Sequence, residues 1–131
     1  MPYATRLDLI DRFGEAEITQ RESMLPDGAV GKALADATAD IDAYIAPRYA
    51  VPVVVASPTL LRLTCDIARY YLAGDSASED TRRRYADAIA ALRDIAAGRR
   101  VLDVPIKPEG APSQTALVTP GAPLVFKRPR P

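Results

Sequence analysis

Apolar residues occupy most of one segment, residues 57–74, and the rest of the chain is organised around it. Its only charged side chains are Arg62, Asp66 and Arg69. Their spacing of four and three places them on one narrow stripe of a helix, where they can pair. A helix that is apolar over most of its circumference is normally buried among other helices. The pattern therefore predicts a central helix over residues 58–73 in a small all-α bundle.

Local signals mark both ends of this central helix. Ser57 can cap the first free N–H groups, and Pro58 follows at the first helical position, where a missing N–H has no cost. Gly74 stands where a left-handed residue commonly ends a helix. The helix is short and charged in mid-span, so we do not expect it to cross a membrane.

The same periodicity predicts further helices, for a bundle of about four to five in all. Thr5 and Asp8 have the spacing of a capping box, and Ser78 can cap the last helix. Pro47 ends the longest of the earlier helices, because the residue before a proline is disfavoured in helical conformation. The predicted helices are residues 6–13, 15–22, 29–46 and 79–97.

Two segments do not have helical periodicity. Residues 48–56 are rich in valine, which favours extended backbone, but Pro52 prevents a central strand. We interpret this segment as an extended connector that packs its valines, with a short edge strand as the alternative. Residues 101–106 could likewise pair as one short β element or lie against the bundle.

Proline becomes frequent near the C-terminus, where seven of the twelve prolines lie from Pro105 onward. Such a segment cannot be helical or build its own core. We therefore divide the chain into a helical domain, residues 1–104, and an extended arm, residues 105–131. Apolar clusters in a segment of this kind often become ordered on a partner. The arm residues that predict a partner interface are Leu117, Val118, Leu124, Val125, Phe126, Lys127, Arg128 and Arg130.

Charge and reactive residue types narrow the possible chemistry. The chain has 17 basic and 17 acidic residues, no histidine and one cysteine, Cys65. The absence of histidine excludes His-based catalysis and His metal sites. No nucleotide-binding motif or nucleophile elbow occurs. We interpret the carboxylates of Asp36, Asp40 and Asp42 as a solvated helix face rather than a metal site. We therefore expect no catalytic residue, no cofactor and no metal.

The two halves of the chain differ in charge. Residues 1–60 carry 5 basic and 9 acidic side chains, whereas residues 61–131 carry 12 and 8. Opposite charges could favour head-to-tail packing of identical subunits, or could have no consequence. The N-terminal sequence MPYATRLDLI has no basic region or long apolar run, so we expect no signal peptide.

Four groups of residues carry a family resemblance. They are Tyr3-Ala4-Thr5 with Asp8-Leu9 and Arg12-Phe13-Gly14-Glu15; Ile41-Asp42-Ala43-Tyr44-Ile45 with Arg48-Tyr49 and Pro52; Pro58 and Leu61 with Asp66-Ile67-Ala68-Arg69-Tyr70; and Tyr85 with Ala88, Leu92 and Gly98. In this order and spacing they resemble the Mu-like phage and prophage family of small head-assembly proteins. That family is similar to the head–tail connector (adaptor) proteins of tailed phages, and the resemblance covers about residues 3–105.

The resemblance implies a structural virion protein that is present in the host bacterial cytoplasm during assembly. Such a connector forms a ring at the portal, extends the DNA channel and joins the head to the tail. Its implied partners are copies of itself, the portal protein and a tail or tail-completion protein. Packaged DNA would pass through without sequence-specific binding, and no membrane or small-molecule substrate is implied.

Two other functions stay open from the residues alone. A small helical DNA-binding or regulatory protein of a prophage would need a basic recognition helix. Arg82, Arg83 and Arg84 are the candidate patch, but we interpret them as a solvated face because two of them have acidic residues four positions away. The third hypothesis is an enzyme subunit or small-molecule binder that uses a pocket in the bundle.

Overall fold

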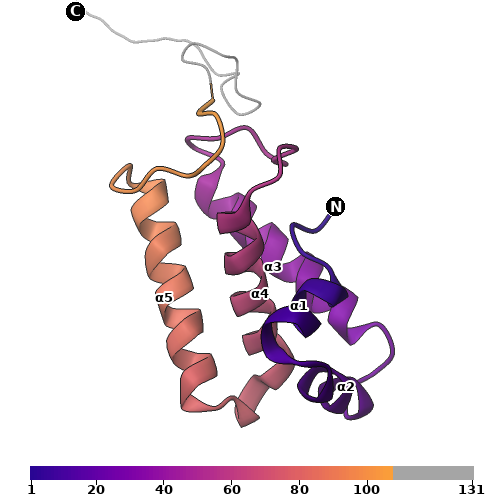
Figure 1. The fold of residues 1–131 in the computed structure, drawn as a ribbon. Helices are drawn as coiled ribbons and strands as arrows, with labels where there is room; N and C mark the ends of the chain where they lie inside the picture. Colours follow the sequence, from indigo (N-terminus) through magenta and orange to yellow (C-terminus); the bar gives the residue numbers. More distant parts are fainter. Residues whose placement is uncertain (108–131) are drawn as a thin grey trace, which may run out of the picture.

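The computed structural model describes residues 1–107 and confirms the all-α bundle (Figure 1). The described residues form five α-helices and one 3-10 turn, and they contain no strand. The β element that we allowed for residues 48–56 or 101–106 is therefore not found there. The elements are α1 (Arg6–Phe13), α2 (Glu15–Ser23), α3 (Ala29–Ile45), α4 (Pro58–Ala73), η1 (Gly74–Ser76) and α5 (Glu79–Ala96).

The central position of α4 is confirmed. It packs against α3, α5 and α1, and Figure 1 shows it between α5 and the remaining helices. Ser57 caps it by accepting a hydrogen bond from the Leu60 N–H at 3.1 Å, and Pro58 is its first residue. Its buried apolar side chains form the middle of the core: Leu60, Leu63, Cys65, Ile67, Ala68 and Leu72.

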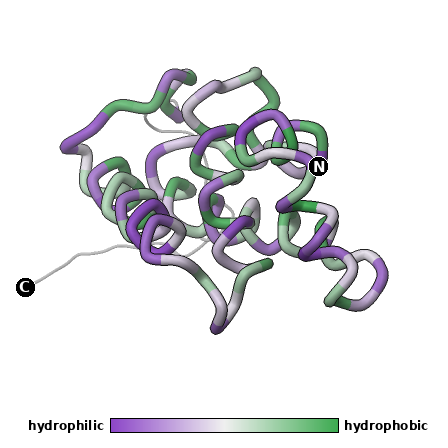
Figure 2. The backbone as a smooth tube through the Cα atoms, turned by 60° about the horizontal axis from the view of Figure 1, so that its bottom comes forward, coloured by the Kyte–Doolittle hydropathy of each residue, from purple (hydrophilic) through white to green (hydrophobic). Residues whose placement is uncertain are grey.

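The other helices bury one face each, as expected of amphipathic helices. Figure 2 shows apolar and polar positions mixed along every helix. In α3 the buried face includes Leu34 and Ile41, and in α5 it includes Leu92 and Ile95. Among the described residues no helix is both long enough and apolar enough to span a membrane.

The predicted caps at the other helix starts are also confirmed. The Thr5 side chain accepts from the Asp8 N–H, and the Asp8 carboxylate accepts from the Thr5 N–H, which completes the capping box of α1. Ser78 accepts from the Thr81 N–H at the start of α5. Gly14 joins α1 to α2 with a φ of 98°, a region that side-chain-bearing residues rarely adopt.

Arg69 of α4 links three other elements. Its guanidinium donates two hydrogen bonds to Glu17 of α2, at 2.8 and 3.0 Å. It also contacts Asp80 of α5 at 3.4 Å and lies over the Phe13 ring of α1 at 4.1 Å. Of the pairs that the α4 stripe allows, Arg62 with Asp66 is found, at 3.8 Å, whereas Arg69 pairs with other helices instead.

Asp66 is a buried carboxyl group on the same stripe. Its side chain is 5% exposed, and its nearest ion-pair partner is Arg62, at 3.8 Å. Within residues 1–107 its Oδ1 atom has no hydrogen-bond partner. Burial raises the pKa of Asp66, and the arginines around it oppose this rise only in part: Arg84, Arg62, Arg12 and Arg69.

Candidate interaction surface

Three segments without helix structure meet at one end of the bundle. They are residues 1–5, residues 46–57 between α3 and α4, and residues 97–107 after α5 (Figure 1). Hydrogen bonds between residues far apart in sequence hold these segments together. This end of the molecule is therefore a defined surface, built on the ends of α3, α4 and α5.

Tyr49 attaches the last described segment to the loop after α3. Its side chain is fully buried, and its hydroxyl accepts a hydrogen bond from the Leu102 N–H at 2.9 Å. Close by in sequence, the Lys107 N–H donates to the Arg48 carbonyl at 2.9 Å. Because Leu102 is itself buried in the core, residues 101–106 lie against the bundle, which was one of our two expectations.

Asp103 attaches the same segment to the start of α4. Its carboxylate accepts hydrogen bonds from the hydroxyl groups of Ser57 and, at 3.2 Å, Thr59. The hydrogen bond from Ser57 lowers the pKa of Asp103, so this carboxyl group is ionised at neutral pH. A negative charge at the N-terminus of α4 is also favourable for the helix dipole.

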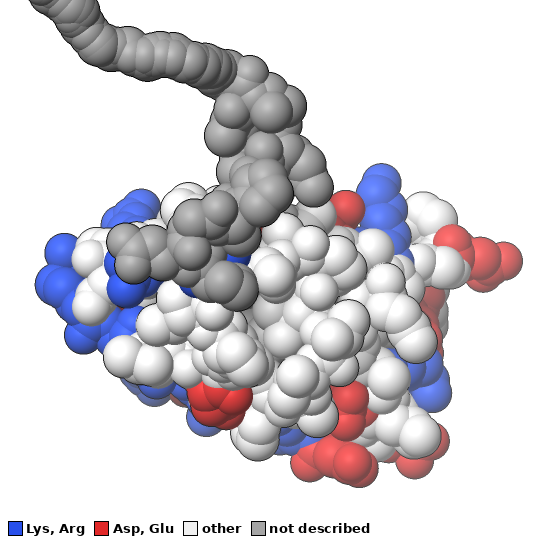
Figure 3. Space-filling view, turned by 90° about the horizontal axis from the view of Figure 1, so that it is seen from above, with Lys and Arg blue, Asp and Glu red and all other residues white. Residues whose placement is uncertain are grey.

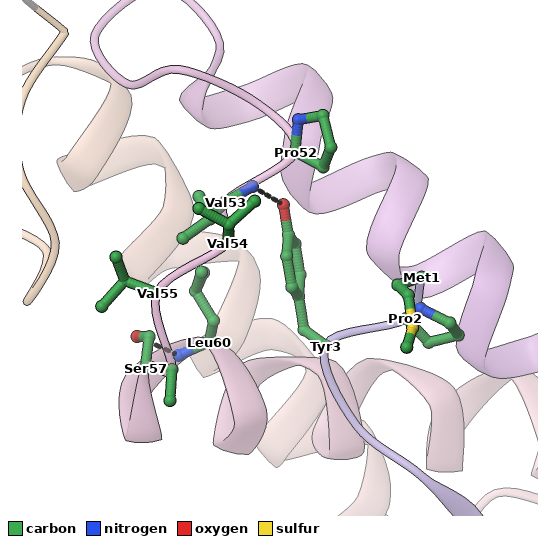
Figure 4. Close-up of a pocket in the computed structure, with 10 residues that line it drawn as sticks. Met1, Pro2, Tyr3, Pro52, Val53, Val54, Val55, Ser57 and Leu60 are labelled. Carbon is green, nitrogen blue, oxygen red and sulfur yellow. Dashed lines mark hydrogen bonds between the residues drawn. The ribbon is translucent and has the colours of Figure 1, made fainter.

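Tyr3 attaches the N-terminal segment to α3 and to the loop (Figure 4). Its N–H donates to Thr38 at 3.1 Å, and its hydroxyl donates to Asp42. The same hydroxyl accepts from the Val53 N–H at 2.9 Å. Burial, together with the hydrogen bond to Asp42, raises the pKa of Tyr3 to about 12.

The outer side of these segments exposes large apolar side chains. Val54 is 91% exposed and Val101 is 75% exposed, whereas most leucines within residues 1–107 are buried. In Figure 3, which views this end, uncharged residues occupy the centre and charged residues lie toward the edges. We call this surface the end face; its exposed apolar residues are Met1, Val51, Val54, Val55, Val101 and Ile106.

Our prediction that the connector packs its valines was wrong for all but one of them. Val53 packs against the core, because its N–H is bound to Tyr3 and its side chain turns inward. Val54 and Val55 point away from the core, and Val51 is also exposed. Adjacent side chains of extended backbone point to opposite sides, so burying Val53 exposes Val54.

A groove runs across the end face between the N-terminal segment and the loop. Its volume is about 520 Å³, and Tyr3, Val54 and Val55 line it (Figure 4). Its walls come from residues 1–3 and 52–57, with Leu60 of α4 also lining it. A mostly apolar groove that is open to solvent fits an apolar peptide segment better than a charged small molecule.

The arm residues that we predicted as an interface lie outside the described residues: Leu117, Val118, Leu124, Val125, Phe126, Lys127, Arg128 and Arg130. The structure instead brings together a surface that our sequence reasoning missed. The valine run beside Pro52 was the available signal, since four valines around a proline suit an exposed extended segment. The role of Tyr3 had no local signal, because its partners are far away in sequence.

Other candidate side chains are used in contacts within the bundle. Asp40 accepts a hydrogen bond from Tyr71 of α4, and Asp42 accepts one from Tyr3. Across residues 1–107, no three Cys, Asp or Glu side chains are placed to hold a metal ion. Of the arginine triplet, Arg84 pairs with Asp80 as predicted, at 3.1 Å, and Arg83 pairs with the same carboxylate.

The fold and the end face define a small all-α protein with an exposed apolar surface at one end. The chain belongs to the family described as Bacteriophage Mu, Gp36, which matches residues 3–119. It is 31% identical to the Mu-like prophage FluMu protein gp36 of Haemophilus influenzae, over 96% of this chain and 93% of that protein. It is 33% identical to gene product J of Escherichia phage Mu, over 95% of this chain and 85% of that protein. The chain is thus a protein of the Mu-like phages and prophages.

Proposed function

We propose that this protein is a head–tail connector, a structural virion component that forms a ring at the portal. The ring would extend the DNA channel and join the head to the tail. Membership of the Mu Gp36 family and the resemblance to connector proteins support a role in the phage particle. The end face is the structural observation that carries the proposal.

A ring needs two different surfaces on each subunit that fit each other and close on themselves. The end face supplies one such surface, because its exposed apolar side chains have a fixed backbone beneath them. Residues 108–131 continue from Lys107 at the same end and carry the apolar clusters at 117–118 and 124–126. Each large apolar side chain that becomes buried would contribute roughly 1.5–3 kcal/mol before ordering costs.

As a connector, the protein would have no catalytic activity, no cofactor and no small-molecule substrate. Its partners would be other copies of the chain, the portal protein and a tail or tail-completion protein. Packaged DNA would pass through the ring without sequence-specific contacts. The protein would be found in the virion and, before assembly, in the host cytoplasm.

The experiment that tests the connector role is a joining assay. A Mu-like phage from which this gene is deleted should yield DNA-filled heads and free tails, and the purified full-length protein should restore joining. The Val54→Asp variant should fail, because it places a charge on the end face, whereas Leu7→Asp on the exposed side of α1 should succeed. Complete virions formed without the protein would refute the proposal.

A prophage regulator that binds DNA is the alternative class. It would give a salt-sensitive mobility shift with duplex DNA, because phosphate contacts release counterions. Arg83 and Arg84 are already paired with Asp80, so the contacts on α5 do not favour this alternative. Self-assembly that nuclease treatment leaves unchanged would support the connector instead.

A further inference from the structure

We propose that the groove of the end face binds residues 124–126 of a neighbouring copy of the same chain. This inference rests on the proposed ring, because it identifies the contact between one subunit and the next. It commits to one occupant of the groove, the apolar segment Leu124-Val125-Phe126. A segment of the same copy and a different protein are the alternatives that the experiment below excludes.

The groove has the size and chemistry for a short apolar peptide. Its volume of about 520 Å³ falls in the usual range for pockets that bind small ligands. Val54, Val55 and Leu60 supply apolar lining, and Tyr3 supplies an aromatic wall. The Tyr3 hydroxyl is already engaged by Asp42 and Val53, so its ring is held in place before any peptide binds.

The proposed occupant matches this lining. Leu124, Val125 and Phe126 form the longest run of large apolar residues after residue 107. Pro123 precedes this run and Pro129 follows it. A proline favours extended backbone at its own position and at the residue before it, which would lower the entropy lost when the flanks of this run bind.

Charge complementarity favours the same occupant. Lys127 and Arg128 directly follow Phe126. On the groove, the ionised Asp103 is bonded to Ser57, which belongs to the lining. Asp103 is exposed, so a cation next to the bound segment can approach it. Such a contact adds orientation more than affinity, because exposed ion pairs contribute little.

The length of the intervening segment allows it to reach a neighbouring copy. Residues 108–123 are 16 residues long and contain Pro108, Pro112, Pro120 and Pro123. A proline-rich linker extends about 3.1 Å per residue, so this one spans roughly 50 Å. A domain of about 100 residues has a radius of gyration of only about 13 Å. The linker is therefore long enough to reach beyond its own subunit to the groove of the next one.

The test is a full-length chain with two added cysteines, Val54→Cys in the groove and Phe126→Cys in the segment. Under mild oxidation, docking between copies predicts a ladder of covalently linked dimers, trimers and larger species. Docking within one copy predicts a cross-linked monomer instead, and that result would overturn the proposal. No cross-linking above the background of the control would overturn it as well.

The chain offers a matched control for this experiment. Met24 is also an exposed apolar residue, but it follows α2, away from the end face (Figure 1). The pair Met24→Cys with Phe126→Cys should therefore give little cross-linking. Cys65 can stay in all variants, because it is fully buried and burial raises its pKa to about 12, so its thiol is unreactive.

A mixture of two single variants checks that the contact joins different copies. One chain carries Val54→Cys and the other carries Phe126→Cys, and oxidation should give mainly the mixed dimer.

The joining assay separates this inference from the connector role. If only cross-linked monomer forms while the protein still joins heads to tails, the groove assignment fails and the connector role stands. If the ladder forms but virions assemble without the protein, the connector role fails and the groove assignment stands.

Discussion

The hydroxyl groups of Tyr3 and Tyr49 each accept a backbone N–H from a distant segment. The partners, Val53 and Leu102, lie 50 and 53 residues away in sequence. A phenol hydroxyl can donate and accept at the same time, so Tyr3 also binds Asp42. The end face therefore depends on two hydroxyl groups, although the Tyr49 ring is buried in the core and the Tyr3 ring lines the groove.

Replacement of Tyr3 by phenylalanine should loosen the end face without disturbing the helices. The ring stays, but Val53 loses its acceptor and Asp42 loses its donor, which should cost about 1–2 kcal/mol. Urea unfolding would measure this loss, and faster hydrogen exchange at Val53 would locate it. Tyr44→Phe is the matched control, because the Tyr44 hydroxyl has no hydrogen bond within residues 1–107. An equal loss of unfolding free energy in both variants would contradict the role of the Tyr3 hydroxyl in holding the end face.

The buried Asp66 should make the protein less stable than a neutral side chain would. Its pKa is raised by burial, so the folded state resists ionisation that the unfolded chain undergoes freely. The destabilisation by ionised Asp66 is therefore present above the pKa of Asp66 in the folded state. It disappears as the pH falls below the pKa of Asp66 in the unfolded chain. Asp66→Asn should raise stability at neutral pH, by on the order of 1 kcal/mol, and change little in acid.

Thermal unfolding of wild type and Asp66→Asn across a pH series would check this expectation. Arg62→Gln is a useful comparison, because it removes the nearest ion-pair partner of Asp66 while leaving the carboxyl group buried. That variant should be less stable than wild type at neutral pH. An Asp66→Asn variant that is strongly destabilised at neutral pH would show that the charged form is favoured instead.

At the scale of elements, two ion pairs hold the short helix α2: Arg6–Glu22 links it to α1, and Arg69–Glu17 links it to α4. It buries a single residue, Ile18, and its Glu17 receives two hydrogen bonds from Arg69 of α4. The Arg69 side chain is only 14% exposed, so solvent screens this pair less than a surface pair. The hydrogen bond from Arg69 is the main reason that the pKa of Glu17 is lowered.

Arg69→Met should loosen α2 from α4, while the apolar packing among α3, α4 and α5 persists. Hydrogen bonds to a charged group of this kind contribute about 1.5–3 kcal/mol, and we expect a loss in that range. Because the pKa of Glu17 is lowered in the folded state, the difference between the two proteins should shrink as the pH falls through that pKa. Urea unfolding at two pH values and hydrogen exchange in α2 would measure both effects. A loss of hydrogen-exchange protection confined to α5 would contradict the role of Arg69 in holding α2.

Local patterns were sufficient to predict the helices, and they were insufficient to predict the end face. The caps at Thr5, Ser57 and Ser78 bind N–H groups three residues away, so the sequence shows them directly. The contact of Ser57 with Asp103 joins residues 46 positions apart, and no periodicity reveals such a pair. The exposure of Val54 follows from the contact between Tyr3 and Val53, which is equally remote in sequence.

At the scale of the whole molecule, the core and the arm are separate in sequence. Within residues 1–107 the core cluster runs from Ala4 to Leu102, and the segment that follows is held by the Lys107 contact with Arg48. A chain ending at residue 107 should therefore unfold in one cooperative transition, with a stability within about 0.5 kcal/mol of the full chain. It should also fail to assemble and fail in the joining assay.

Circular dichroism during thermal unfolding, and light scattering across a concentration series, would check these two expectations. The full chain with Leu124, Val125 and Phe126 changed to serine is a matched control, since it keeps the length and removes the apolar run. It should behave like the shortened chain. Assembly of the shortened chain into the same species as the full chain would contradict the role of the arm.

Three hydrogen bonds hold the end face together, Tyr3–Val53, Tyr49–Leu102 and Lys107–Arg48, and they determine when this surface forms during synthesis and folding. Tyr3, Val53 and Leu102 come from the beginning, middle and end of the described chain, so the surface is complete only after synthesis has passed residue 107. Contacts between such distant residues also form late in folding. A growing or half-folded subunit therefore lacks the finished groove and, in the proposed ring, could not yet bind a neighbour. In the ring that we propose, these hydrogen bonds would therefore restrict assembly to completed subunits.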